Sequence, residues 1–211
     1  MRDAEVSSVE IDGLTVAYRR AGRGPPILLL HGILSDSRAW MAQLQGLSDE
    51  LTTIAWDAPG AGASSDPPED FSAADYANCL AAFIERLECE TAHILGLSWG
   101  GVLAQELYRR HPGQARSLIL ADTYAGWRGS LPEAVCQARL ASCIRESDLP
   151  PEEWVGDWIP GLLTAGASGR MREEVEQIMS EFHPAGYRAM ARPWRPPTPG
   201  TCCPGSMCRR C

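Results

Sequence analysis

The sequence predicts an α/β fold in which a mainly parallel sheet is flanked by helices. Short, wholly apolar runs such as Ile27 to Leu30 are typical of strands that are covered on both faces of a parallel sheet. Strand-like and helix-like stretches alternate as far as Ala121, which is the pattern of a parallel sheet with crossover helices. The 211 residues are 45% hydrophobic and 22% charged, so the chain has the composition of a globular protein with one sizeable core.

The elements are expected in a simple order. The alternating stretches Val6 to Ile11 and Leu14 to Tyr18 flank the turn signal Asp12-Gly13 and predict an antiparallel pair. The other predicted strands cover residues 27–30, 52–56, 92–95 and 117–121, and the predicted helices between them cover 40–47, 73–87 and 100–110. Helical patterns then replace strands, at 132–144, 154–163 and 171–182. We therefore expect a core at residues 1–124, a helical lid at 125–191 and an irregular, Pro- and Cys-rich tail at 192–211.

Net charge and cysteine placement restrict the expected binding partners, cellular location and state of the thiols. A net charge of −8 disfavours nucleic acid and anionic membranes, so we expect a small-molecule partner. No apolar stretch at the N-terminus has the length of a signal peptide or membrane span, which predicts a cytoplasmic protein. Four of the eight cysteines are scattered and are expected to be free thiols, and four crowd the last ten residues.

The stretch Gly96-Leu97-Ser98-Trp99-Gly100 closes a predicted strand and opens a predicted helix. A serine hydroxyl becomes a useful nucleophile when a sharp strand-to-helix turn exposes it beside a base, and such a turn needs small neighbours. Gly96 and Gly100 occupy the two positions where a side chain would crowd the backbone. The pattern predicts a nucleophile elbow with Ser98 as the attacking residue; the alternative is a glycine-rich turn that only packs.

A second motif, His31-Gly32-Ile33, follows the buried strand 27–30. Acyl transfer passes through an oxyanion that two fixed backbone N–H groups stabilise, and loss of one such donor typically costs about 3 kcal/mol. We expect Ile33 and Trp99 to be these donors. His31 lies at a strand end before a glycine, so we expect it to shape the loop rather than to act as general base.

The glycine-spaced loop from Asp57 to Ser64 is a third motif. It lacks the Gly-Lys-Ser/Thr ending of a P-loop and the three-glycine pattern that binds a dinucleotide. We therefore interpret it as a structural loop near the pocket and expect no cofactor.

Taken in order, the His31-Gly32 turn, the loop from Asp57 to Ser64, the elbow and the strand end Leu118 to Asp122 resemble the α/β-hydrolase superfamily over about six-tenths of the chain. The elbow, followed by Gly101 and Ala104-Gln105, looks most like the esterase, enol-lactonase and C–C hydrolase branch. This resemblance implies an α/β-hydrolase fold with a helical lid, and an acyl-enzyme on Ser98 that water releases. Serine at the elbow departs from haloalkane dehalogenases and epoxide hydrolases, which carry aspartate there.

Relatives of this kind place an acid and then a histidine downstream of the serine. Only His111 and His183 follow Ser98, and neither occupies the late loop position of the family. Asp122, at a strand end, is a candidate acid, although it could equally cap its own loop. We expect the C-terminal strands to be missing because of a frameshift near Arg192. A zinc site formed by Cys202, Cys203, Cys208 and Cys211 is a disfavoured alternative, so no metal is expected.

Two functions follow from these residues. The first is a serine hydrolase that acts on carboxylic esters or lactones. The second is a catalytically inactive, hydrolase-like protein in which Ser98 has no base.

Overall fold

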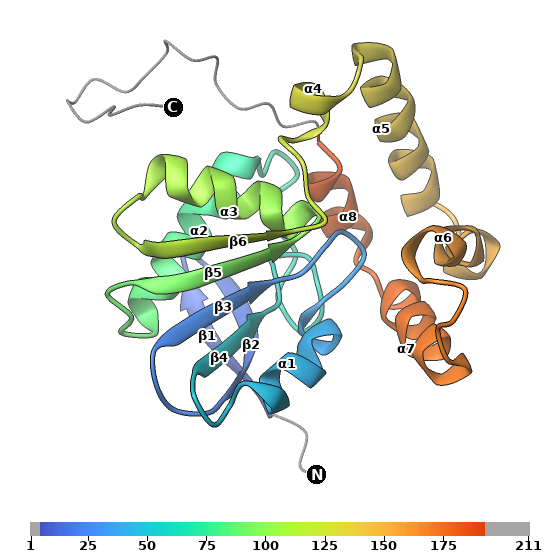
Figure 1. The fold of residues 1–211 in the computed structure, drawn as a ribbon. Helices are drawn as coiled ribbons and strands as arrows, with labels where there is room; N and C mark the ends of the chain where they lie inside the picture. The colour runs from blue at the N-terminus through green and yellow to red at the C-terminus, as the bar shows by residue number, and fades with distance from the viewer. Residues whose placement is uncertain (1–4, 193–211) are drawn as a thin grey trace.

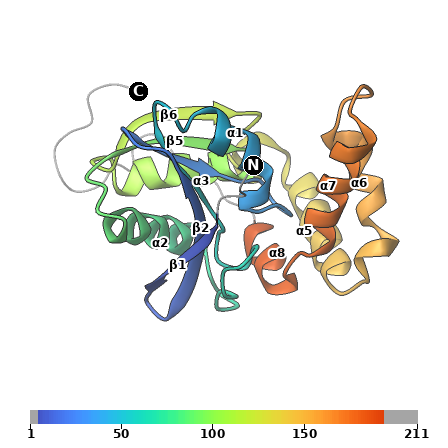
Figure 2. The same ribbon diagram turned by 90° about the horizontal axis from the view of Figure 1, so that it is seen from below.

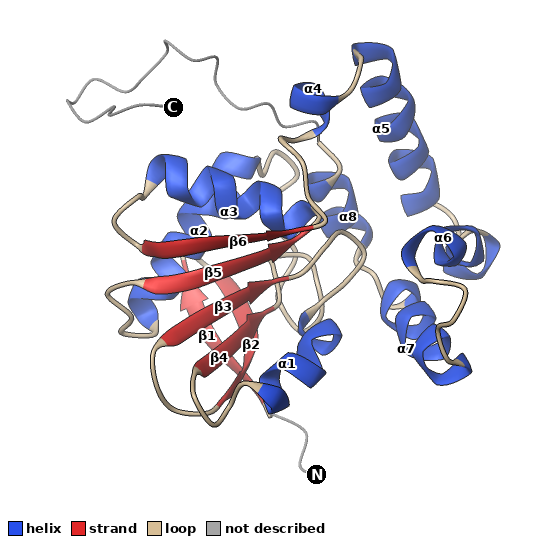
Figure 3. Cartoon of the chain, in the orientation of Figure 1, coloured by secondary structure: helices blue, strands red, loops and turns tan. Residues whose placement is uncertain are grey.

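Residues 5–192 are described by a computed structural model and form an α/β structure around one six-stranded sheet (Figure 1). The strand order is β1-β2-β4-β3-β5-β6, and the four strands β3 to β6 run parallel. The strands are β1 (Val6–Ile11), β2 (Leu14–Ala21), β3 (Pro26–Leu30), β4 (Thr52–Trp56), β5 (Ala92–Leu97) and β6 (Ala115–Ala121). The prediction of a mainly parallel sheet flanked by helices is confirmed (Figure 3).

The chain opens with the antiparallel hairpin that the sequence predicts. Ile11 pairs with Leu14, which leaves Asp12 and Gly13 as a two-residue turn. Both turn residues have positive φ, 48° and 82°, and such turns match the right-handed twist of the flanking strands. β2 continues to Ala21, beyond the predicted end, because its last residues pair with β4.

The central strands are buried on both faces. Leu28, Leu29 and Leu30 of β3 are fully buried, and each such side chain contributes roughly 1.5–3 kcal/mol when it leaves water. Because side chains alternate along a strand, Leu28 and Leu30 join one apolar cluster while Ile27 and Leu29 join another on the opposite face. This explains why the strand is an unbroken apolar run.

Helices cover these two faces unequally (Figure 2). α2 (Ala73–Arg86) and α3 (Trp99–Arg110) pack on the face of Leu28 and Leu30. α1 (Met41–Gly46), preceded by the 3₁₀ turn η1 (Ser37–Trp40), packs on the other face through Leu44. α2 begins at a capping box in which Ser72 and Asp75 bond each other's backbone amides.

Between β6 and residue 192 the described elements are all helical. The helices are α4 (Trp127–Ser130), α5 (Glu133–Ser147), the 3₁₀ turn η2 (Pro151–Glu153), α6 (Val155–Leu162), α7 (Gly169–Ser180) and α8 (Pro184–Met190). We call residues 127–190 the helical segment. It lies beyond the carboxyl ends of the parallel strands (Figure 1). Its role as a lid stays a prediction.

Three further observations bear on the sequence predictions. Cys79, Cys89, Cys136 and Cys143 are free thiols. Across residues 5–192, no helix is both long and apolar enough to cross a membrane, and no group of three or more metal-ligating side chains gathers at one place. The proposed frameshift and the alternative zinc site involve residues beyond 192 and lie outside the described residues.

Candidate active site

Ser98 forms the sharp turn between β5 and α3. Its φ of 52° and ψ of −114° lie in a region that residues other than glycine rarely adopt, and such strain persists only where neighbours enforce it. The Ser98 N–H donates to the Ala121 carbonyl at 3.0 Å, and the Thr123 hydroxyl donates to the Ser98 carbonyl at 2.6 Å. The end of β6 therefore fastens the turn from one side.

The two glycines of the motif allow the turn to close. A Cβ on Gly96 would lie 2.3 Å from the Gly100 carbonyl oxygen, and a Cβ on Gly100 would lie 2.2 Å from the Leu30 carbonyl oxygen. Backbone atoms thus occupy the space that any side chain would need. The turn joins strand to helix as the motif requires, and the role of Ser98 as a nucleophile stays a prediction.

The loop after β3 lies directly beside Ser98. A Cβ built on Gly32 would be 3.5 Å from the Cβ of Ser98. His31 is fully buried: its Nε2 accepts a hydrogen bond from the Ala58 N–H at 3.0 Å, and its Nδ1–H donates to the Gly32 carbonyl at 2.7 Å. With both nitrogens occupied, the neutral ring fixes the loop, which agrees with the scaffold role expected from the sequence.

Ile33 and Trp99 are the two candidate oxyanion donors. Trp99 begins α3, so its N–H has no acceptor inside the helix. Within residues 5–192, neither the Ile33 nor the Trp99 backbone N–H donates a hydrogen bond. Two unpartnered amides on the elbow and on the loop beside it are what stabilisation of an oxyanion requires.

Both candidate donors line an open pocket of about 470 Å³. Aromatic and aliphatic side chains dominate its wall, and Arg192 is the one charged residue there among the described residues; the lining is Ile33, Ala73, Tyr76, Trp99, Val102, Tyr124, Gly126, Trp127, Ala189, Met190 and Arg192. Burial raises the pKa of Tyr76, and its hydroxyl donates to the Pro59 carbonyl at 3.0 Å. Tyr76 therefore stays neutral and forms part of an apolar wall.

None of the four histidines is hydrogen-bonded to Ser98, and each has another environment. His93 is the second residue of β5, about 16 Å along the strand from the elbow, and it bonds Ser117. His111 follows the far end of α3, about 18 Å along the helix, and bonds Asn78. His183 lies beside α8, where Nδ1 faces Asp66 at 2.7 Å and Nε2 faces the Gly62 carbonyl at 3.2 Å. Both nitrogens of His183 therefore face Asp66 and Gly62 rather than Ser98.

Asp122 directly follows β6, has a φ of 42° and is exposed. No hydrogen bond joins its carboxylate to another residue within 5–192, so the structure shows neither a loop cap nor a histidine partner for it. Asp122 stays a candidate acid.

Asp57 explains the third sequence motif. Its buried carboxylate accepts hydrogen bonds from the backbone N–H groups of Ser37 at 2.7 Å and Ala63 at 3.0 Å. The Ser64 hydroxyl donates to the Asp57 carbonyl and accepts from the Ala17 N–H. These bonds tie the loop to β2 and to η1, which is the structural role expected from the sequence.

The fold and the elbow together define an α/β protein of the hydrolase type. The family model described as the alpha/beta hydrolase fold matches residues 25–149, which is more than half of the chain. The chain belongs to this family.

Individual relatives agree with that membership. The chain is 38% identical over 112 residues to an uncharacterized protein of Mycobacterium tuberculosis, covering 53% of this chain and 33% of that protein. It is 33% identical over 122 residues to a poly(3-hydroxyalkanoate) depolymerase of Ectopseudomonas oleovorans, covering 56% and 43%. A thermophilic esterase from Thermogutta terrifontis superposes with a TM-score of 0.78 at 25% identity, covering 91% of this chain and 73% of that one. These matches cover 33% and 43% of the lengths of the two curated relatives, so this chain spans less than half of either one.

Proposed function

We propose that this chain carries the nucleophile and oxyanion elements of a serine hydrolase that cleaves carboxylic esters or lactones. The observation that carries the proposal is the elbow itself: Ser98 has a strained backbone, and the Ile33 and Trp99 amides, which have no acceptor within residues 5–192, belong to residues that line an apolar pocket. Names among the relatives and structural neighbours, a depolymerase of a polyester and an esterase, support the substrate class.

The proposed reaction has two half-reactions. Ser98 Oγ attacks the substrate carbonyl carbon and loses its proton to a base, while the Ile33 and Trp99 N–H groups stabilise the oxyanion. The C–O bond to the leaving group breaks, and the alcohol departs with a proton. Water then attacks the acyl-enzyme, releases the carboxylic acid and restores the Ser98 hydroxyl.

The lining of the pocket restricts which ligands can bind but does not determine which reaction follows. Its apolar, aromatic wall suits a small-molecule acyl group rather than a polymer of like charges. Asp122 is the proposed acid of the site, at the strand end beside the elbow. No described residue is assigned as the base.

The second candidate function is a hydrolase-like protein without catalytic activity. It is favoured by one observation, that none of the four histidines bonds Ser98. Serine hydrolases that lose a triad member still retain roughly 10³–10⁴-fold catalysis over water. Weak turnover by this chain can therefore be told apart from the uncatalysed rate in an assay.

Hydrolysis of a p-nitrophenyl ester of a short-chain acid by the purified chain tests the proposal. We expect turnover above the uncatalysed rate, and Ser98→Ala should lower it, with any remaining turnover coming from the oxyanion donors and substrate binding alone. Thr91→Ala is a control remote from the elbow, since Thr91 precedes β5 and Ser98 follows it. Equal rates for the wild-type chain and Ser98→Ala would contradict the hydrolase and support the inactive alternative.

A further inference from the structure

The loop that holds the candidate donor Ile33 also reaches into the helical segment. Leu34 has a φ of 58°, a conformation that a bulky L residue rarely adopts. Its side chain is 6% exposed and belongs to an apolar cluster whose other buried members all come from residues 143–191. We call this cluster the lid cluster; its buried members are Leu34, Cys143, Trp154, Val155, Ile159, Met179, Tyr187 and Ala191.

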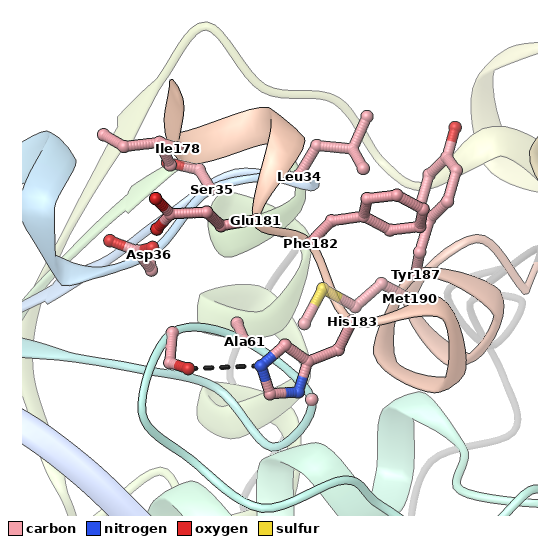
Figure 4. A pocket seen from close by; sticks show the side chains of 12 residues that line it. Leu34, Ser35, Asp36, Ala61, Ile178, Glu181, Phe182, His183, Tyr187 and Met190 are labelled. Carbon is pink, nitrogen blue, oxygen red and sulfur yellow. Dashed lines mark hydrogen bonds between the residues drawn. The ribbon is translucent and has the colours of Figure 1, made fainter. Parts of the chain in front are cut away.

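Three aromatic rings make the lid cluster a rigid support. Trp154, Phe182 and Tyr187 contact one another with ring centroids 5.3 to 5.8 Å apart. The Tyr187 hydroxyl donates to Glu146 at 2.6 Å, which also fixes α8 against α5. Figure 4 shows the Leu34 side chain beside the rings of Phe182 and Tyr187. The leucine therefore packs against a surface made of three different helical regions.

The two ends of the loop are held by different parts of the molecule. His31 is fixed to the core through Ala58, and Gly32 lies beside Ser98. Leu34 is fixed to the lid cluster. Ile33 stands between them, its side chain packs against both the core cluster and the lid cluster, and its N–H has no acceptor within residues 5–192.

We propose that Leu34 is a positioning residue through which the helical segment sets the oxyanion site. Burial of the Leu34 side chain in the lid cluster keeps the backbone at positive φ, and this conformation presents the Ile33 N–H beside Ser98. When the helical segment separates from the core, Leu34 loses its partners and the loop relaxes toward ordinary φ values. The donor then leaves the elbow, so reactivity at Ser98 follows docking of the helical segment.

The functional readout rests on the proposed hydrolase function. The chain would be treated with a fluorophosphonate, and the maximal labelling rate of Ser98 would be separated from the reagent concentration that gives half of that rate. We expect Leu34→Ala to lower the maximal rate about tenfold or more, while the half-saturating concentration stays within about twofold, because loss of one oxyanion donor costs roughly 10²–10³ in rate.

Two further variants separate the effect of backbone conformation at residue 34 from the effect of side-chain packing in the lid cluster. Asparagine tolerates positive φ but cannot fill an apolar cluster, so Leu34→Asn should be as slow as Leu34→Ala. Methionine fills the cluster, so Leu34→Met should restore the rate to within about threefold of the wild-type chain. Leu107→Ala is the matched control, because Leu107 is a fully buried leucine more than two helical turns from Ser98 along α3. Wild-type labelling by a folded Leu34→Ala protein would overturn the proposal.

Hydrogen exchange tests the same coupling without chemistry at Ser98. The amides of Ser37, Arg38 and Ala39 are bonded to Asp57 or Asp36, so their protection reports on the anchored loop. We expect Leu34→Ala and Phe182→Ala each to speed exchange over residues 34–40, and Leu107→Ala to leave it unchanged. Unchanged exchange in Phe182→Ala would contradict the coupling. An unlabelled wild-type chain with the expected exchange pattern would contradict only the hydrolase function.

Discussion

Replacing Gly100 with alanine tests how closely the elbow is held against the end of β3. The new Cβ would lie 2.2 Å from the Leu30 carbonyl oxygen and 2.7 Å from the His31 carbonyl oxygen, whereas ordinary contact begins near 3.4 Å. Because both obstacles are backbone atoms, α3 or the loop after β3 must move by about 1 Å, and overpacking of this kind typically costs about 1–3 kcal/mol. A displacement of about 1 Å at a reacting group can lower the rate roughly 100-fold.

Denaturant unfolding and ester hydrolysis would measure the two effects of Gly100→Ala. We expect a free energy of unfolding lower by about 1–3 kcal/mol and a rate constant lower by about 100-fold. Gly156→Ala in α6 is the matched control, since nothing lies within 4 Å of the position of its Cβ; there alanine should stabilise the helix by up to about 1 kcal/mol. A Gly100→Ala protein as stable and as reactive as the wild-type chain would refute the packing argument.

Three further predictions concern the support of the site and the core. Thr123→Val removes the hydroxyl that donates to the Ser98 carbonyl, so we expect the free energy of unfolding to fall by about 1 kcal/mol and the labelling of Ser98 to slow; a change in neither would contradict the role of this bond. Burial raises the pKa of Glu106, but hydrogen bonds from two neighbouring arginines outweigh this effect and hold that pKa below 4.5. The stability that the lowered pKa contributes is present above about pH 4.5 and is lost as the pH falls further. Glu106→Gln should therefore flatten the acid side of a plot of the free energy of unfolding against pH. Burial also raises the pKa of the Cys79 thiol to about 12, and it raises the pKa of the Cys143 thiol. Iodoacetamide at pH 8 should therefore modify both thiols only after unfolding. Mass spectrometry of the native and the unfolded chain can check this.

The features that sequence reasoning predicted well are local. Asp12-Gly13 specifies its own hairpin turn, and the apolar run 27–30 can be satisfied only by a strand with both faces covered. The tight strand-to-helix turn at Ser98 is likewise local, because Gly96 and Gly100 make room for a turn whose geometry involves residues close in the chain and the end of a neighbouring strand. Periodicity and turn chemistry carry this information directly.

The features that sequence reasoning missed depend on contacts between distant segments. His183 and Asp66 are 117 residues apart, and their pairing follows from the docking of α8 on the loop after β4. The positive φ of Leu34 is equally hidden, since leucine does not favour it and the lid cluster that holds it forms only from residues after 142. The separate helix α8 was also not predicted within the range 125–191. Its start at Pro184 is a recognisable signal, because proline is favoured in the first turn of a helix.

Peptide mapping of the fluorophosphonate adduct would identify which residue of the native chain is the nucleophile. We expect one added phosphonyl group, located on Ser98, and no adduct on the Ser98→Ala protein. An unmodified wild-type chain, or an adduct that persists in Ser98→Ala, would contradict the claim that the elbow between β5 and α3 presents an activated serine.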